Sequence, residues 1–337
     1  MVTKKRDVSY ELIRVLAMLF IVFDHALNSY LAPDVTKYIE PFFTVGVTLF
    51  FMLSGKFAFR LNLEDKSLYK KYYWKKIIGL IIPMLVYMAI KNWHIMVYNQ
   101  HLEVTLGSYV RHFGTALVNG FSYMEYWFLY LLIPLLIAVP FTARMMQNMK
   151  LRDKKAFLIV SLVLSAITMI VPNVFKMDFA MDYYFIGYIF YFYFGYIVED
   201  IFEKESAKKK VYIAGLIGFI ATIALVVLER KTGYKSFSPF YVFFTSAMFL
   251  GVREIGKKIP KKLEKLVTFI GKHSLGVYMI HIMFFYIIRD LHFFPENAFG
   301  YIGCALTTAT VSIAASFILD STVIRLLQKP CEKFIGE

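Results

Sequence analysis

Ten segments of about 20 mostly apolar residues run through this chain of 337 residues, and they constrain its fold more than any other feature. Wound as an α-helix, about 20 such residues cross the hydrocarbon core of a bilayer. The segments are residues 9–31, 41–59, 77–98, 123–142, 156–173, 183–200, 211–229, 239–252, 268–290 and 300–320. The sequence therefore predicts an all-α fold, a polytopic membrane helix bundle with about ten transmembrane helices.

The composition excludes other classes of protein. The chain is 58% hydrophobic and only 18% charged, whereas a soluble domain is roughly half apolar and about a quarter charged. Its 34 Phe, 10 Pro and 2 Cys do not fit a disordered, collagen-like or disulfide-stapled chain. No connection between the segments is long enough for a second globular domain. We expect a single integral-membrane domain over 1–337 with no appended soluble domain.

The basic residues predict how the chain is oriented. With the N-terminus in the cytoplasm, 27 of the 38 Lys and Arg fall in cytoplasmic segments, 6 in outer connections and 5 within spans. Cytoplasmic loops collect Lys and Arg, so this bias predicts that both termini are cytoplasmic. The net charge of +14 then reflects topology and contact with anionic lipid, and it does not indicate nucleic-acid binding.

Ionisable residues within the apolar segments are the candidates for function, because each is costly unless it faces protein, water or a ligand. They include Glu11, Arg14, Asp24, His25, Lys56, Lys91, His94, Glu125, His273, His281 and Arg289, and Asp182 stands just before the sixth segment. Four of them lie near segment ends, where we expect the side chains to reach the membrane surface: Glu11, Lys91, Asp182 and Arg289.

Arg14 and His25 form the most informative pair. They are 11 residues apart on the first segment, which returns them to nearly the same face of a helix about 16 Å apart along its axis. A cation on the cytoplasmic side and an imidazole toward the outer leaflet suit a long ligand whose anionic end enters from the cytoplasm. A purely structural role, with Arg14 paired to Glu11, remains the alternative.

The ninth segment carries a second polar face. Ser274, Tyr278 and His281 stand at positions i, i+4 and i+7, on one side of a helix. They place a hydroxyl, a phenol and an imidazole in a row through the membrane. Hydrogen bonding between helices would explain Ser274 and Tyr278 equally well.

Further candidates lie near the ends of three other segments. Ser54, followed by Gly55, permits close approach of a neighbouring helix, and Lys56 either reaches the headgroups or meets a phosphate. Lys75 and Lys76 place cations at the cytoplasmic mouth of the third segment. Glu125, at the outer face, is either solvated or within reach of an imidazole.

Several common catalytic motifs are absent from the sequence. It contains no HExxH or CxxC, no P-loop, no GxGxxG and no GxSxG. We therefore expect no metal site.

Taken together, the motifs resemble those of the acyltransferase-3 family, ten-span membrane O-acyltransferases of bacterial surface glycans. The shared patterns are R-x10-H (Arg14, His25), FFMLSG at 50–55, YWFL at 126–129 and S-x3-Y-x2-H (Ser274, Tyr278, His281). The basic cluster before a proline, KKIIGLIIP at 75–83, matches with lysines where arginines are more usual. The resemblance covers nearly the whole chain, and four motifs in the same order are more specific than any one of them.

The resemblance implies that an acyl group, most often acetyl, moves from cytoplasmic acyl-CoA to a hydroxyl or amino group of a cell-surface polysaccharide or glycolipid outside the plasma membrane. It implies donor-binding roles for Arg14, Ser54, Lys56, Lys75 and Lys76. It implies catalytic roles for His25, Glu125, Tyr278 and His281.

Two mechanisms fit His25 under this resemblance. The imidazole deprotonates the acceptor hydroxyl as a general base, or it attacks the thioester and forms an acyl-imidazole. Glu125 would then orient the ring or accept a proton, and Tyr278 or His281 would stabilise the oxyanion.

Two points stay open at the level of the sequence. Many relatives carry an appended extracytoplasmic domain; without one, the chain either modifies its glycan acceptor itself or passes the acyl group to a partner protein. The alternative function is a polysaccharide or small-solute transporter or flippase, in which the buried charges line a path. The sequence shows no inverted repeat.

Overall fold

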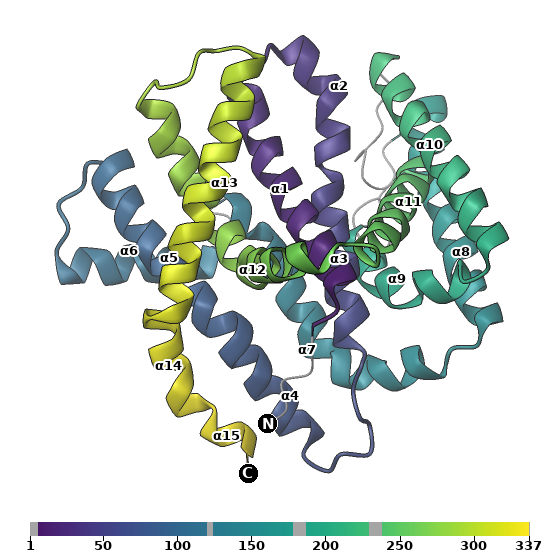
Figure 1. Ribbon diagram of the computed structural model, residues 1–337, viewed down its shortest axis with the longest axis horizontal. Helices are drawn as coiled ribbons and strands as arrows, with labels where there is room; N and C mark the ends of the chain where they lie inside the picture. The colour runs from purple at the N-terminus through teal and green to yellow at the C-terminus, as the bar shows by residue number, and fades with distance from the viewer. Residues whose placement is uncertain (1–5, 120–123, 178–186, 229–237, 337) are drawn as a thin grey trace. The chain divides into compact units, whose positions relative to one another are not determined.

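A computed structural model describes residues 6–119, 124–177, 187–228 and 238–336, and every regular element within those ranges is a helix (Figure 1). Within the described ranges, eight helical stretches are long and apolar enough to cross a membrane. They are Val8–Tyr30, Pro33–Ala58, Leu68–Asn99, Trp127–Asn148, Leu151–Phe175, Glu205–Val227, Lys261–Asp290 and Ala298–Cys331. The all-α, polytopic membrane fold expected from the sequence is thus confirmed.

The other two expected segments are also helical. They coincide with α9 (Tyr188–Ile201) and α11 (Pro239–Gly256), which do not belong to the eight stretches. Residues 183–186 of the expected segment 183–200 lie outside the described residues. The number ten and the orientation of the termini stay predictions.

The helices belong to two compact units that interleave along the chain. The first unit comprises residues 1–60 and 142–272, and the second comprises 61–141 and 273–337. The first contains α1 (Val8–Tyr30), α2 (Pro33–Phe43), α3 (Val45–Ala58), α8 (Leu151–Ile170), η4 (Val171–Phe175), α9, α10 (Glu205–Val227) and α11. The second contains α4 (Leu68–Lys76), η1 (Ile77–Ile81), α5 (Ile82–His94), η2 (Ile95–Asn99), α6 (Leu106–Asn119), η3 (Met124–Tyr126), α13 (Ala298–Ser321), α14 (Val323–Cys331) and α15 (Lys333–Gly336). The chain passes from one unit to the other after residue 60, within α7 (Trp127–Asn148) and within α12 (Lys261–Asp290).

Glycines set the helix packing of the first unit. Gly55 on α3 lies directly against the backbone of Phe192 on α9, and Gly195 on α9 lies against the backbone of Met52 on α3. Gly218 on α10 meets α11 in the same way, and these two helices run side by side in Figure 1. Small residues let transmembrane helices approach closely where lipid supplies no hydrophobic drive. The glycine in FFMLSG therefore has a packing role in this fold.

A π-helical turn interrupts the first spanning helix of the second unit. The turn η1 precedes Pro83, which lacks an N–H and whose ring crowds the carbonyl of Gly79. The wider π-helical turn accommodates the proline without ending the helix, which continues to Asn99. The lysines at the end of α4 thus stand on the same helical path as α5.

Within the second unit, the C-terminal helices α14 and α15 pack against α4 and η1. Trp74 on α4 stacks on Phe334 of α15 with ring centroids 4.5 Å apart, and Gln328 on α14 donates to the carbonyl of Ile78 at 2.8 Å. The helix α6, which the sequence analysis did not predict, is tied to α5 by the Tyr109 hydroxyl, 2.8 Å from the carbonyl oxygen of Ala89.

The turn before α4 is fixed by Asp65. Its carboxylate accepts from the hydroxyl of Ser67 at 2.6 Å, from the amide of Ser67 at 2.9 Å and from Lys71 at 3.0 Å. The Ser67 hydrogen bonds, followed by the Lys71 contact, lower the pKa of Asp65 to about 2. Since this pKa lies below its unfolded value, the turn keeps its full stability above pH 4 and loses it as the pH falls toward 2.

Substitution of Gly195 by Ala tests the packing of α3 on α9. A Cβ at this position would collide with the Met52 backbone, so we expect destabilisation by about 2 kcal/mol or more and a Tm lower by several degrees. The control is Gly114→Ala on α6, where no atom lies within 4 Å of the added Cβ. Thermal unfolding of the detergent-purified variants measures both, and equal Tm values would contradict the packing argument.

Candidate active site

Arg14 and His25 stand on one uninterrupted helix. The helix α1 (Val8–Tyr30) is 23 residues long, and it is capped by Asp7, whose side chain accepts from the amide of Ser9 at 3.0 Å. Both side chains are half-buried. The helical spacing that the sequence predicted between them is therefore present, and their Cα atoms lie about 16 Å apart along the helix axis.

The side chain of Arg14 makes only long contacts with its described neighbours in the first unit. Its Nε lies 3.9 Å from Glu11 Oε2, and its guanidinium carbon lies 5.6 Å from the centroid of the Phe57 ring. Among the residues that the structure describes, Nε is buried without a hydrogen-bond partner, while the side chain keeps 31% exposure. Arginine has five N–H donors in a fork that fits phosphate or carboxylate oxygens. The environment of Arg14 therefore suits an anionic ligand.

Close helix packing positions α1. Gly46 on α3 faces the carbonyl oxygen of Ala17, which would lie 2.5 Å from a Cβ at that glycine. Gly256 on α11 faces the Cα of Ser9 at the same distance, and Gly271 on α12 lies against Glu11. Three neighbouring helices thus contact α1 through glycine, which holds its position in the first unit.

Lys56 lies in a buried charge cluster. It is 7% exposed and forms an ion pair with Glu199 on α9, which also pairs with Arg253 at 2.6 Å. The hydroxyl of Tyr10 donates to both oxygens of Glu199 at 2.9 Å. Lys56 therefore has a carboxylate partner within the protein that the sequence did not predict. Ser54, two residues earlier, is half-buried.

In the second unit, Glu125 pairs with Lys91. The carboxylate is 1% exposed, the lysine on α5 is 5% exposed, and the two form an ion pair. The ammonium also lies 5.5 Å from the centroid of the Tyr126 ring. Such a pair matches each charge with its opposite where neither meets solvent.

Tyr278 and His281 belong to the same cluster as Glu125. The Tyr278 hydroxyl donates to the backbone carbonyl of Glu125, and the Tyr126 hydroxyl donates to that of Met279 at 3.0 Å. The His281 ring is fully buried, and its Nδ1 lies 2.7 Å from the carbonyl oxygen of Tyr278. Because a carbonyl only accepts, the Nδ1 atom carries a proton and donates it. Ser274, which starts this face, is buried as well.

The two lysines near the start of the third segment differ in exposure. Lys75 is exposed, and Lys76 is half-buried with its ammonium 5.2 Å from the centroid of the Tyr72 ring. Both stand in the last turn of α4.

The expectation that Glu11 and Lys91 reach the membrane surface is wrong. Each is 5% exposed and ion-paired within its own unit. Arg289 keeps 40% side-chain exposure beside Asp290, and Asp182 lies outside the described residues.

Sequence reasoning missed a polar cluster around His273, near the middle of α12. His273 lies 2.6 Å from Asp320, which also accepts from the Tyr87 hydroxyl at 3.1 Å. The sequence did mark His273 as an ionisable residue within a span, but the spacing gave no sign of Asp320 on α13 or of Tyr87 on α5, which donates to Asp320.

The candidate residues divide between the units. The first unit holds Arg14, His25, Ser54 and Lys56, and the second holds Lys75, Lys76, Glu125, Tyr278 and His281. Each group includes a buried ion pair, Lys56 with Glu199 in the first unit and Glu125 with Lys91 in the second.

The described helices and their buried ionisable groups are those of a multi-pass, all-helical membrane protein. Within that class, the family model of acyltransferase-3, described as an acyltransferase domain, matches residues 7–319. The chain therefore belongs to the acyltransferase-3 family, as its motifs predicted. Neither the curated proteins nor the solved structures contain a match to it.

The buried pair of Lys91 and Glu125 is open to a double-mutant test. Lys91→Met leaves Glu125 buried without its cation and should destabilise the protein by about 3–5 kcal/mol. Adding Glu125→Gln should recover most of that loss, because no buried charge is then left without its partner. Thermal unfolding in detergent measures both effects.

The matched control is the exposed pair of Lys37 and Asp34, 3.1 Å apart. Lys37→Met should change stability by no more than about 1 kcal/mol, as for other surface ion pairs. If the losses of stability from Lys91→Met and from Glu125→Gln add in the double variant, the result would contradict the ion pair.

Proposed function

We propose that this member of the acyltransferase-3 family moves an acyl group, most simply acetyl, from cytoplasmic acyl-CoA across the bacterial plasma membrane. The acceptor is a hydroxyl of an extracytoplasmic cell-surface polysaccharide or glycolipid. The family match supports the acyl transfer, and the predicted topology supports the direction.

The observation that carries the proposal is the arrangement of Arg14 and His25 on α1. Arg14 has a buried Nε that no described residue satisfies, which fits a phosphate oxygen of acyl-CoA. The pantetheine arm is about as long as four extended residues, roughly 14 Å. An arm of this length, starting near Arg14, would place the thioester close to His25, about 16 Å along the helix.

The chemistry that we assign to His25 is general-base catalysis. A neutral imidazole takes the proton of the acceptor hydroxyl as the oxygen attacks the thioester carbonyl carbon. The carbon–sulfur bond then breaks, and the imidazolium returns the proton to the leaving thiolate, giving CoA and the acyl ester. The acyl group crosses without CoA crossing.

We assign the second cluster to the acceptor side of the reaction. His281, whose Nδ1 donates to a carbonyl, leaves its Nε2 atom for a hydrogen bond with a sugar hydroxyl. Glu125 supplies the charge that keeps Lys91 in place, and Tyr278 ties that segment to α12. Lys75 and Lys76 add cations for the donor phosphates on the cytoplasmic side.

Acceptor-dependent release of CoA thiol tests this function in purified protein given labelled acetyl-CoA and glycan acceptors. His25→Ala should lower the transfer rate by at least about 100-fold, since a positioned general base contributes that much or more. The control is His101→Asn, an exposed imidazole whose φ of 50° asparagine also adopts.

Undiminished transfer by His25→Ala would refute the role of His25. If the wild type releases no thiol but moves glycan or solute between compartments, the protein is a transporter. Acid quenching of a single turnover distinguishes the two mechanisms, since only direct attack by His25 leaves label on the protein as an acyl-imidazole.

A further inference from the structure

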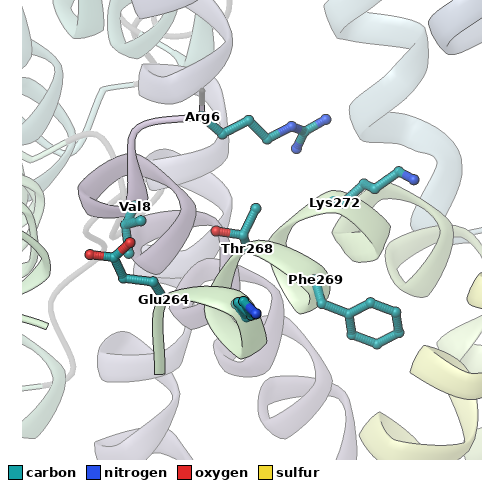
Figure 2. A pocket seen from close by; sticks show the side chains of 7 residues that line it. Arg6, Val8, Glu264, Thr268, Phe269 and Lys272 are labelled. Carbon is teal, nitrogen blue, oxygen red and sulfur yellow. The ribbon is translucent and has the colours of Figure 1, made fainter. Parts of the chain in front are cut away.

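A cavity in the first unit has no role in the site described above. Its volume is about 360 Å³, and it lies where the residues that lead into α1 meet the first half of α12 (Figure 2). It is lined by Arg6, Val8, Glu264, Lys265, Thr268, Phe269 and Lys272. The predicted orientation places this end of α1 in the cytoplasm.

The α12 side of the cavity is one face of a helix. Lys265, Phe269 and Lys272 stand at positions i, i+4 and i+7, with Thr268 between them. In Figure 2 the cationic ends of Arg6 and Lys272 extend to one side of the view, and the carboxylate of Glu264 lies at the other beside Val8. Three cations against one carboxylate give the cavity a net positive charge.

The lining also offers apolar surface. Phe269 is 40% exposed, and Val8, the methyl group of Thr268 and the carbon stems of the lysines belong to the same lining. A planar ring can stack on an aromatic side chain while its phosphates meet arginine and lysine. This combination suits a phosphorylated nucleotide better than a small inorganic anion.

The cavity is linked to Arg14 through Glu11. Arg6 donates to both oxygens of Glu11 at 3.3 Å, and Arg14 lies 3.9 Å from the same carboxylate. Gly271, next to Lys272 on α12, lies directly against Glu11. The cavity therefore adjoins the face of α1 on which Arg14 and His25 stand.

We propose that this cavity binds the adenosine bisphosphate end of acyl-CoA, with Arg6, Lys265 and Lys272 holding its phosphates and Phe269 stacking on the adenine. This inference rests on the proposed function, which supplies the donor. It adds a nucleotide subsite that is formed by residues of the first unit.

Titration calorimetry of the full chain in nanodiscs of zwitterionic lipid tests the subsite, with CoA and adenosine 3′,5′-bisphosphate as probes. The double variant Lys265→Ala, Lys272→Ala should bind both probes about tenfold more weakly or worse, since each lysine removed takes a charge-assisted contact to phosphate. Lys262→Ala, an exposed lysine of the same helix outside the cavity, is the matched control and should bind as the wild type does.

A variant that is expected to tighten binding distinguishes an effect on the cavity from a general loss of folding. Glu264→Gln removes the negative charge from the cavity and should tighten binding of the bisphosphate several-fold. A loss of affinity in this variant would overturn the assignment of the phosphates to this cavity.

The outcomes separate the subsite from the proposed function. If the lysine variant binds CoA like the wild type, the subsite is refuted while transfer from acyl-CoA stands. If it keeps its CoA affinity but loses stabilisation by phosphatidylglycerol nanodiscs, the cavity holds a lipid headgroup and the subsite is again refuted. If the wild type binds no CoA, the donor of the proposed function fails as well.

Discussion

The cost of placing a charge in hydrocarbon shapes this protein more than any other interaction. Each ionisable group at membrane depth must be matched by protein, water or ligand. Glu199 meets this requirement with Lys56, Arg253 and Tyr10, and Glu125 meets it with Lys91. Arg14 is different, because its contact with Glu11 is long and its buried Nε has no hydrogen-bond partner among the described residues. An anionic substrate would complete its environment, and for this reason we place the donor there.

Close packing at glycine gives these charges fixed positions. Gly55 and Gly195 bring α3 and α9 together, and this contact lies within one helical turn of the pair formed by Lys56 and Glu199. Gly256 and Gly271 hold the start of α1, from which the face of Arg14 begins. Backbone contact of this kind leaves little room for helices to shift. The same glycines therefore support both the fold and the geometry of the candidate site.

Local periodicity predicted most of the fold. Apolar runs marked the helices, and the spacing of Arg14 and His25 placed both on one face of α1, because each signal lies within a single segment. Pairings between distant segments could not be predicted, so Lys91 was expected at the membrane surface although it pairs with a carboxylate 34 residues away. The helix α6 was missed because it is shorter than a membrane span. Of the candidate site, the sequence marked the residue types and their order, while the partners required the fold.

We propose that residues of α1 transfer an acyl group from a donor on one side of the membrane to an acceptor on the other. The most direct measurement uses sealed vesicles that contain the protein, with labelled acetyl-CoA on the cytoplasmic side only and an impermeant glycan acceptor on the other side only. If the protein transfers the acyl group in this way, we expect labelled glycan on the acceptor side and free CoA on the donor side. Vesicles with the Arg14→Ala or His25→Ala variant should form neither product. Labelled glycan that forms only when donor and acceptor share one compartment would contradict this proposal.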